Sequence, residues 1–447
     1  MSKLAFRRAY SALLALTFAS LLTSSAFAAN KVDLHTRKVS KDYLKKFTPK
    51  SGMNVENSVA RKRSASVRAS SGISGVDTLT NWTDSFTEPG FDNAGNPQSV
   101  WPYAMVGNAP ESHRTTFINA PVIPVTLQVV DASGNVVNDP DTGAPLIQRV
   151  TPGIVNAVLE SPLFEAFAYT SGFGQFNDQM QRAEFWDRIH HGHGWESENG
   201  WHTLLNSRLK RTRTMSIPAS AVLYALNADG TCCEFMLVDD STFTAALFPP
   251  TFPVDNTTVI GAAELAGDMR TRDLTSFLFN NVYLFDAGSG SCCVLGFHEY
   301  DFEPGVPSNG NLPRFYVMDY SSWISPGLFG GGFQDITAMS HEISETFNDP
   351  FVNNWTPWWL SLDPATGFGL CQDNLETGDV VEVLSSNVTY TVGLNNRTYH
   401  LQNEALFPWF AFESPSPARL GAYSFPDETT VTTLSPPNLL PGCTPAP

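Results

Sequence analysis

The segment 335–347 constrains the fold of this chain more than any other, because its sequence pattern predicts a helix with one buried side. Its apolar residues are spaced three, four and four positions apart, which places them along one stripe: Ile336, Met339, Ile343 and Phe347. Asp335 suits the N-cap and the positive end of the helix dipole. Asn348 tolerates a left-handed C-terminal conformation, and Pro350 prevents continuation. The stripe requires a packed core beside this helix.

The polar side of the same predicted helix carries candidate chemistry. His341 and Glu345 are four residues apart, so they point the same way, one turn apart, and could hold one divalent metal ion. Glu342 lies between them. This is the arrangement of HExxH zinc peptidases with Glu in place of the second His. In those enzymes the intervening Glu takes a proton from a water molecule that attacks a polarised carbonyl. The alternative is a structural helix whose polar side is solvated.

A third metal ligand is expected from the acidic cluster Glu376-Thr-Gly-Asp379, which follows Cys371. Either Glu376 or Asp379 could complete the site. Asp349 is a further candidate, although a role in fixing the turn at Pro350 suits it better. Zn is the expected ion, and a set this rich in carboxylates also suits Ca or Mn.

The segment 341–350 resembles the pattern HE-L/I-x-E-x-x-T/N-D/N-P of secreted zincin-like proteins. These include uncharacterised bacterial proteins and the plant phosphate-induced, exordium-like family. Many of them continue with a Trp or Tyr and an ExGD segment beside a cysteine, as this chain does over 333–380, about a tenth of its length. Here Cys371 precedes the acidic cluster, whereas the relatives place the cysteine after it.

The resemblance implies a zincin-like α+β core, in which a mixed or antiparallel sheet packs on the active-site helix. It implies that His341 and Glu345 bind the metal and that Glu342 is the general base. It also implies that Glu376 or Asp379 is the third ligand.

The N-terminal segment is typical of an export signal. Basic residues are followed by an apolar stretch at 12–22 and by Ala26-Phe-Ala28, which predicts a signal peptide over 1–28. The apolar stretch is too short to span a bilayer comfortably, and no later run reaches 18 apolar residues. We therefore expect a secreted or periplasmic protein without stable membrane insertion.

The rest of the chain consists of a basic segment followed by an acidic one. Residues 31–75 hold 11 Lys and Arg against 3 acidic residues, whereas 76–447 has a net charge of −28. Residues 29–75 are predicted to be a poorly ordered basic linker or pro-segment. Residues 76–447 are expected to form a single domain because no obvious linker divides them. A composition of 42% hydrophobic and 16% charged residues allows that domain a large core. The acidic body argues against a nucleic-acid partner.

Local patterns predict further elements in this body. Helices are expected at 152–167, 175–189 and, from a short apolar run, 274–278. Strands are expected at 122–130, 221–226, 234–238, 281–285, 293–297, 315–319, 379–383, 388–392 and 399–402.

Six cysteines fit an oxidising compartment. Because adjacent cysteines rarely bridge each other, the pairs Cys232-Cys233 and Cys292-Cys293 are expected to crosslink across neighbouring strands, and Cys371 to join Cys443. Six cysteines allow 15 pairings, so the connectivity stays open.

Other histidines are weaker candidates. The loop 190–194 is rich in His and, with His202, could bind a metal or simply be solvated; one of these residues could reach the 341–345 site. His298 directly follows the strand expected at 293–297. In zincins the strand before the active helix lines the substrate groove, and there His298 could stabilise an oxyanion or be an ordinary core histidine.

The leading functional prediction is a secreted metal-dependent, peptidase-like hydrolase acting on protein or peptide, or in contact with an extracellular or cell-wall polymer. The alternative is a non-catalytic extracellular binding or adhesion protein that keeps the fold and holds a structural metal. No GxSxG motif supports a serine hydrolase. Glycoside hydrolysis needs only two carboxylates, and the acidic body leaves it open.

Overall fold

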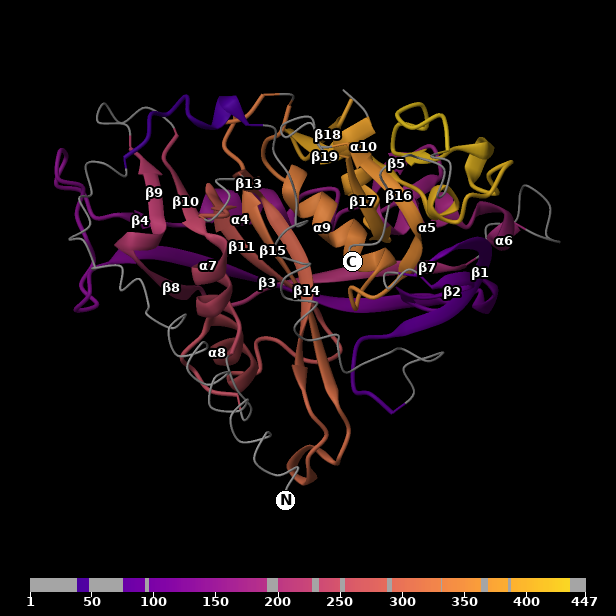
Figure 1. The fold of residues 1–447 in the computed structure, drawn as a ribbon, viewed down its shortest axis with the longest axis horizontal. Coiled ribbons are helices and arrows are strands. Elements are labelled where there is room, and N and C mark those ends of the chain that lie inside the picture. The colour runs from indigo at the N-terminus through magenta and orange to yellow at the C-terminus, as the bar shows by residue number, and fades with distance from the viewer. Residues whose placement is uncertain are drawn as a thin grey trace, which may run out of the picture. The chain divides into compact units, whose positions relative to one another are not determined.

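The structure is a computed structural model, and a mixed seven-stranded sheet is its largest element (Figure 1). The described residues are 38–47, 75–92, 96–190, 200–226, 233–249, 254–287, 292–330, 332–362, 369–384 and 387–434. The strand order is β14-β15-β11-β3-β4, and β7 and β8 also pair with β3. The sheet consists of β3 (Thr115–Val130), β4 (Ile147–Gln148), β7 (His202–Leu209), β8 (Arg213–Pro218), β11 (Leu274–Asn280), β14 (Gly296–Glu303) and β15 (Arg314–Trp323).

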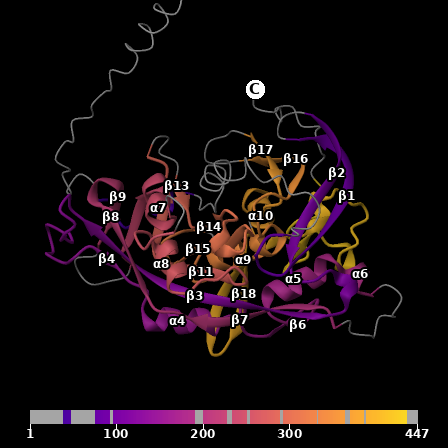
Figure 2. The ribbon, with the colours of Figure 1, turned by 90° about the horizontal axis from the view of Figure 1, so that it is seen from below.

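The long strand β3 joins two parts of this sheet. Its first half pairs with β7 and its second half with β8, both in parallel, and Figure 2 shows these two strands toward opposite ends of β3. β11 is parallel to both β3 and β15. β14 pairs with β15 in the antiparallel direction. In this pairing His298 on β14 lies opposite Asp319 on β15.

A second, four-stranded sheet has the order β13-β12-β10-β9. Its strands are β9 (Val222–Ala225), β10 (Phe235–Asp239), β12 (Val282–Phe285) and β13 (Cys292–Val294). Paired strands outside the two sheets are β1 (Asn81–Phe91) with β2 (Pro97–Val106), β5 (Phe167–Tyr169) with β6 (Gly172–Gly174), β16 (Trp355–Leu362) with β17 (Gly369–Asn374), β18 (Thr389–Leu394) with β19 (Arg397–Gln402), and β20 (Glu404–Ala405) with β21 (Ser424–Phe425).

The α-helices among the described residues are α4 (Pro152–Leu159), α5 (Phe176–Glu184), α6 (Trp186–His190), α7 (Asp240–Leu247), α8 (Val259–Leu265), α9 (Thr337–Asn348), α10 (Thr377–Leu384) and α11 (Phe407–Phe410). The predicted α+β class is therefore confirmed at this coarse level. The helix predicted at 152–167 ends at Leu159, and the one predicted at 175–189 is split at Phe185 into α5 and α6.

Two element predictions are wrong. The apolar run 274–278 is not helical but forms strand β11, buried between β3 and β15. A short run buried on both faces has no period that separates helix from strand. The segment 379–383 is not a strand but lies in helix α10, which contacts α9, β16 and β20. Here tertiary packing outweighs the β-propensity of its valines.

The cysteine prediction is also wrong for one pair. Cys292 and Cys293 form a disulfide with each other, so this pair does not crosslink to another strand. The prediction rested on the rarity of bridges between adjacent cysteines, and rarity does not exclude one. Cys232, Cys443 and the side chain of Cys371 lie outside the described residues.

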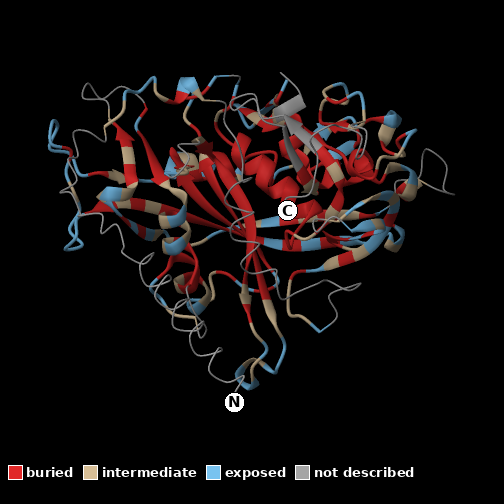
Figure 3. Cartoon of the chain, in the orientation of Figure 1, coloured by how far each residue is buried: buried red, intermediate tan, exposed pale blue. Residues whose placement is uncertain are grey.

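Helix α9 confirms the predicted apolar stripe. Its apolar residues join one core with side chains from β11, β14 and β15: Ile336, Met339, Ile343, Phe347, Leu274, Leu278, Tyr300 and Val317. The helix also contacts α5, α10, β2 and β19. Every residue of α9 is consequently buried (Figure 3). The polar side of the helix is therefore not solvated.

The ends of α9 differ from prediction. The N-cap is Ile336, without a side-chain cap, because the Asp335 carboxylate is engaged by His400, whose Nδ1 lies 2.6 Å from Oδ2. Asn348 remains helical rather than left-handed. Asp349 accepts hydrogen bonds from the backbone N–H groups of Asn353 and Asn354, which confirms its role in a turn.

Part of the predicted linker packs on the body. Leu44 is fully buried, and Lys38 Nζ lies 3.1 Å from Asp139 Oδ2. The backbone N–H of Val39 donates to the carbonyl of Tyr224. The predicted signal peptide and the rest of 29–74 lie outside the described residues. Within the described part of the chain, no helix combines the length and apolar character needed to cross a bilayer.

Buried polar residues also line the contact between α5 and α9. Asn177 Nδ2 donates to Ser344 Oγ at 2.8 Å. Glu184 is buried at the end of α5, where its Oε2 accepts from the backbone N–H of Phe407 at 3.3 Å. Burial raises the pKa of Glu184 to about 8, although the hydrogen bond from Phe407 opposes this shift.

We expect Glu184→Gln to flatten the pH dependence of stability. Because the folded pKa of about 8 exceeds the ordinary value of 4.5, the folded state binds more protons between these pH values. Stability therefore falls as pH rises from 4.5 to 8, by up to about 1.4 kcal/mol per pH unit from this group. Gln removes that contribution. Thermal unfolding of both proteins at pH 5, 6, 7 and 8 measures it, with the exposed Glu165→Gln as control. If stability changed equally with pH in wild type, Glu184→Gln and Glu165→Gln, the raised pKa of Glu184 would be refuted.

Candidate metal centre

Helix α9 and the start of α10 bring the five predicted site residues into one buried cluster. His341, Glu342 and Glu345 belong to α9, Glu376 directly precedes α10, and Asp379 lies in its first turn. None of the five is more than 3% exposed. The acidic segment expected to supply a third ligand thus reaches the helix.

The first group of donor atoms consists of His341, Glu345 and Asp379. His341 Nε2 lies 2.9 Å from Glu345 Oε1 and 3.9 Å from Asp379 Oδ1. One donor atom from each residue lies within 4.8 Å of the other two. Of the two acids proposed as third ligand, Asp379 is therefore the one that accompanies His341.

The other nitrogen of His341 faces a second carboxylate. Nδ1 lies 3.6 Å from Glu382 Oε1, so Nε2 is the nitrogen on the side of Glu345 and Asp379. Asp379 and Glu382 are three residues apart on α10, a spacing that places them on one side of a helix. A strand over 379–383 would have sent them to opposite faces. The helical conformation of this segment is thus what brings both acids to His341.

Gly378 lets the two helices approach each other at this point. A Cβ on Gly378 would lie 2.1 Å from His341 Nδ1. The backbone N–H of Gly378 donates to Glu345 Oε1 at 3.0 Å, and its carbonyl accepts from Gln402 Nε2 at 3.0 Å. Gln372 Nε2 donates to Asp379 Oδ2 at 3.1 Å. These contacts hold the carboxylates of Glu345 and Asp379 in fixed orientations.

A second group of donor atoms consists of His298, Glu345 and Glu376. His298 Nδ1 lies 3.5 Å from Glu345 Oε2 and 3.9 Å from Glu376 Oε2. The same nitrogen lies 3.9 Å from Glu342 Oε2. His298 is 1% exposed and comes from strand β14.

His298 is not among the metal ligands predicted from the sequence. Strand alternation could have found it, because Gly296, His298 and Tyr300 must share one face of β14. That face turns toward α9: a Cβ on Gly296 would lie 2.6 Å from Glu342 Cγ, and Tyr300 belongs to the core of the α9 stripe. The oxyanion role considered for His298 remains a prediction.

The carboxylates create a strongly negative environment. Burial alone would lower the pKa of His341, but Glu345 and Glu342 outweigh it and raise the pKa well above its ordinary value. Burial likewise favours a higher pKa for Glu345, yet His341 and His298 hold that pKa below its usual range. Burial raises the pKa of Glu404, whose Oε2 accepts from Thr377 Oγ1. A potential that outweighs the desolvation of an imidazolium also favours a metal cation.

Other candidates from the sequence lie elsewhere. His190 stacks on Trp186, and His202 Nδ1 pairs with Asp178 Oδ2 at 2.9 Å. His191 and His193 lie outside the described residues. Asp349 belongs to neither donor group.

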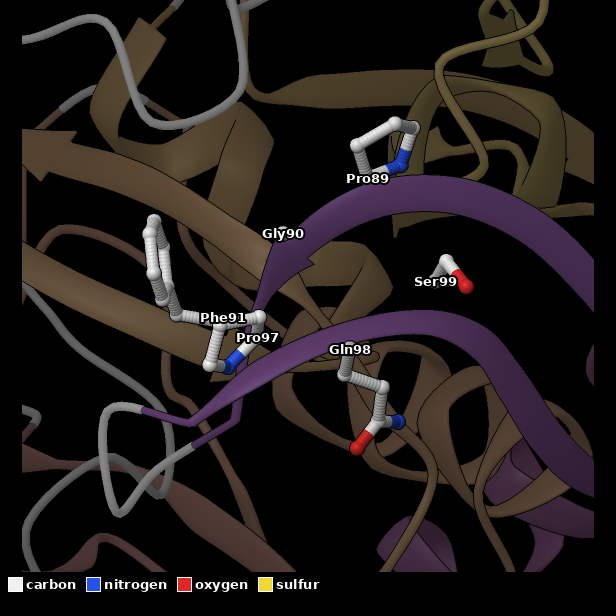
Figure 4. Close-up of a pocket in the computed structure, with 6 residues that line it drawn as sticks. All are labelled: Pro89, Gly90, Phe91, Pro97, Gln98 and Ser99. Carbon is white, nitrogen blue, oxygen red and sulfur yellow. The ribbon is translucent and has the colours of Figure 1, made fainter.

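A hollow in the β1–β2 hairpin shares no lining residue with this centre. Figure 4 shows its lining residues, Pro89, Gly90, Phe91, Pro97, Gln98 and Ser99. None of these side chains is titratable, and none belongs to the two donor groups. The hollow therefore offers contact surface but no acid–base chemistry.

Fold and site together define a mixed α+β protein with a buried histidine–carboxylate centre that could hold a metal ion. No protein-family model, curated protein or solved structure matches the chain.

Proposed function

We propose that this chain is a secreted, zincin-like metal-dependent hydrolase that acts on peptide bonds. His341, Glu345 and Asp379 would hold the ion, and Glu342 would be the general base. The observation that supports this most strongly is the distance of 2.9 Å between His341 Nε2 and Glu345 Oε1. Asp379 Oδ1 lies 3.9 Å from the same nitrogen, and all three side chains are buried.

The donor atoms suit a small divalent ion. Bonds from Zn to N or O are about 2.1 Å long, so two ligands of one ion are at most about 4.2 Å apart. Both distances from His341 Nε2 lie below this limit. Glu382 at the other ring nitrogen matches the outer carboxylate that usually orients a metal-binding His. We propose Zn, with Ca or Mn as alternatives because most donors are carboxylates.

When bound, a divalent ion supplies Lewis acidity, which polarises a substrate carbonyl and makes a water molecule easier to deprotonate. Glu342 follows His341 directly on α9, and its side chain lies beside Gly296 on β14. Its carboxylate would accept the proton of the attacking water and return it to the leaving amine. His341 and Glu345 would fix the position at which the carbonyl is activated.

A second candidate function is a non-catalytic extracellular binding or adhesion protein in which the ion stabilises the fold. The burial of the donors favours this reading, because His341, Glu345 and Asp379 are at most 3% exposed. Structural metal sites are closed, whereas catalytic sites keep a position open to substrate. The two candidates therefore differ in whether a peptide reaches Glu342.

The variant Glu342→Gln separates them. For a hydrolase we expect unchanged metal content and a loss of activity on a casein and peptide panel of at least about 100-fold, because a positioned general base contributes that much. Glu165→Gln, at an exposed position, is the matched control. A wild-type protein that binds metal but hydrolyses nothing would reject the peptidase and favour the binding protein. A Glu342→Gln protein as active as an active wild type would reject Glu342 as the general base.

A further inference from the structure

We propose that the centre binds two cations, the second held by His298, Glu345 and Glu376. This inference rests on the proposed function, since Glu345 would belong to both sites. It adds a ligand, His298, that lies 43 residues before His341 and outside the HExxE motif.

The distances within the second group fit one ion. His298 Nδ1 is 3.5 Å from Glu345 Oε2 and 3.9 Å from Glu376 Oε2. These separations exceed those of a good hydrogen bond and remain below about 4.2 Å, the largest distance between two ligand atoms on one small divalent ion. One donor atom from each of the three residues lies within 4.8 Å of the other two, so small adjustments would let one ion contact all three side chains.

Glu345 divides its two oxygens between the two groups. Oε1 lies 2.9 Å from His341 Nε2 and accepts from the N–H of Gly378, whereas Oε2 lies 3.5 Å from His298 Nδ1. A carboxylate oriented in this way can bridge two ions. Carboxylate-bridged ion pairs are one of the arrangements that hydrolases use.

Polar residues surround the remaining ligands of the second group. Asn374 Nδ2 donates to Glu376 Oε1 at 2.5 Å, which turns Oε2 toward His298. Asp319 is paired with His298 across β14 and β15, so both side chains lie on the same face of the sheet. The Asp319 carboxylate is held by hydroxyl groups of Ser276 and Ser321.

The charge of the described residues also favours two ions over one. Five carboxylates lie within 4.0 Å of an imidazole nitrogen in this cluster: Glu342, Glu345, Glu376, Asp379 and Glu382. With neutral imidazoles their formal charge is −5. One divalent ion would leave three of these negative charges uncompensated, and two would leave one. Uncompensated buried charge is costly, so the second ion would stabilise the centre.

Metal stoichiometry tests this inference on the full chain. Protein stripped with a chelator and dialysed against excess Zn²⁺ should contain two equivalents by elemental analysis. His298→Ala and the nearly isosteric Glu376→Gln should each contain one, and His202→Ala, which changes a histidine outside the cluster, should contain two. Circular dichroism confirms that each variant is folded, and the wild-type count does not depend on any variant.

The outcomes distinguish this inference from the proposed function. One equivalent in wild type, unchanged in His298→Ala, overturns the second site and leaves the proposed single-ion site standing. Two equivalents in both wild type and folded His298→Ala place the second ion elsewhere and also overturn the inference. No bound metal in wild type overturns both proposals.

Discussion

Replacing Glu345 by Gln should reduce the affinity for Zn²⁺ by at least about 100-fold. Outer residues that merely orient a metal ligand contribute about 10- to 100-fold, and Glu345 would be a direct ligand of both ions. A neutral amide oxygen lacks the charge that attracts the cation, and an amide cannot bridge two ions as a carboxylate does. Its NH₂ group would also meet the N–H of Gly378, which now donates to Glu345 Oε1.

Competition with a chromophoric chelator measures this affinity. Glu382→Gln is a graded control, because Glu382 Oε1 faces His341 Nδ1 at 3.6 Å from outside the donor group and should contribute about 10- to 100-fold. Glu165→Gln, at an exposed position, should change nothing. Wild-type affinity in folded Glu345→Gln would show that the ion binds elsewhere.

Gly378→Ala should disrupt the centre without removing any ligand. The added Cβ would lie 2.1 Å from His341 Nδ1, 2.3 Å from Cε1 and 2.7 Å from Cγ. Such distances force the imidazole or helix α10 to move, and overpacking of this kind costs about 1–3 kcal/mol of stability. The moved ring would no longer aim Nε2 at Glu345, so we expect metal affinity to fall together with the melting temperature.

Gly393→Ala is the matched control for this prediction. Gly393 lies in β18, is exposed, and a Cβ there would meet no atom within 4 Å. Thermal unfolding and Zn²⁺ titration of both variants compare the same chemical change in crowded and open surroundings. Equal behaviour of Gly378→Ala, Gly393→Ala and wild type would contradict the close packing of Gly378 on His341.

The sequence was most informative where a single period governs a segment. The spacing of Ile336, Met339, Ile343 and Phe347 predicted both helix α9 and its buried side, because a helix with such a stripe has few ways to bury it. The same period placed His341 and Glu345 together. It could not reveal that the polar side is also buried, since that depends on α5, α10 and β19, which are distant in the chain.

Segments without a clear period were predicted poorly. The run at 274–278 is apolar on both faces because β11 lies inside the sheet, so helix and strand patterns coincide. At 377–384 the valines suggested a strand, but packing against α9 makes the segment helical and sets Asp379 and Glu382 on one side. His298 was not recognised as a possible ligand because its role depends on the pairing of β14 with β15 and on the contact of both with α9.

Anomalous diffraction from crystals of the full chain soaked in Zn²⁺ tests the central claim most directly. We expect a peak at the zinc edge bounded by His341 Nε2 and the carboxylates of Glu345 and Asp379. Zinc found only at other residues, or a zinc-saturated crystal with these three side chains in direct contact and no peak among them, would contradict it.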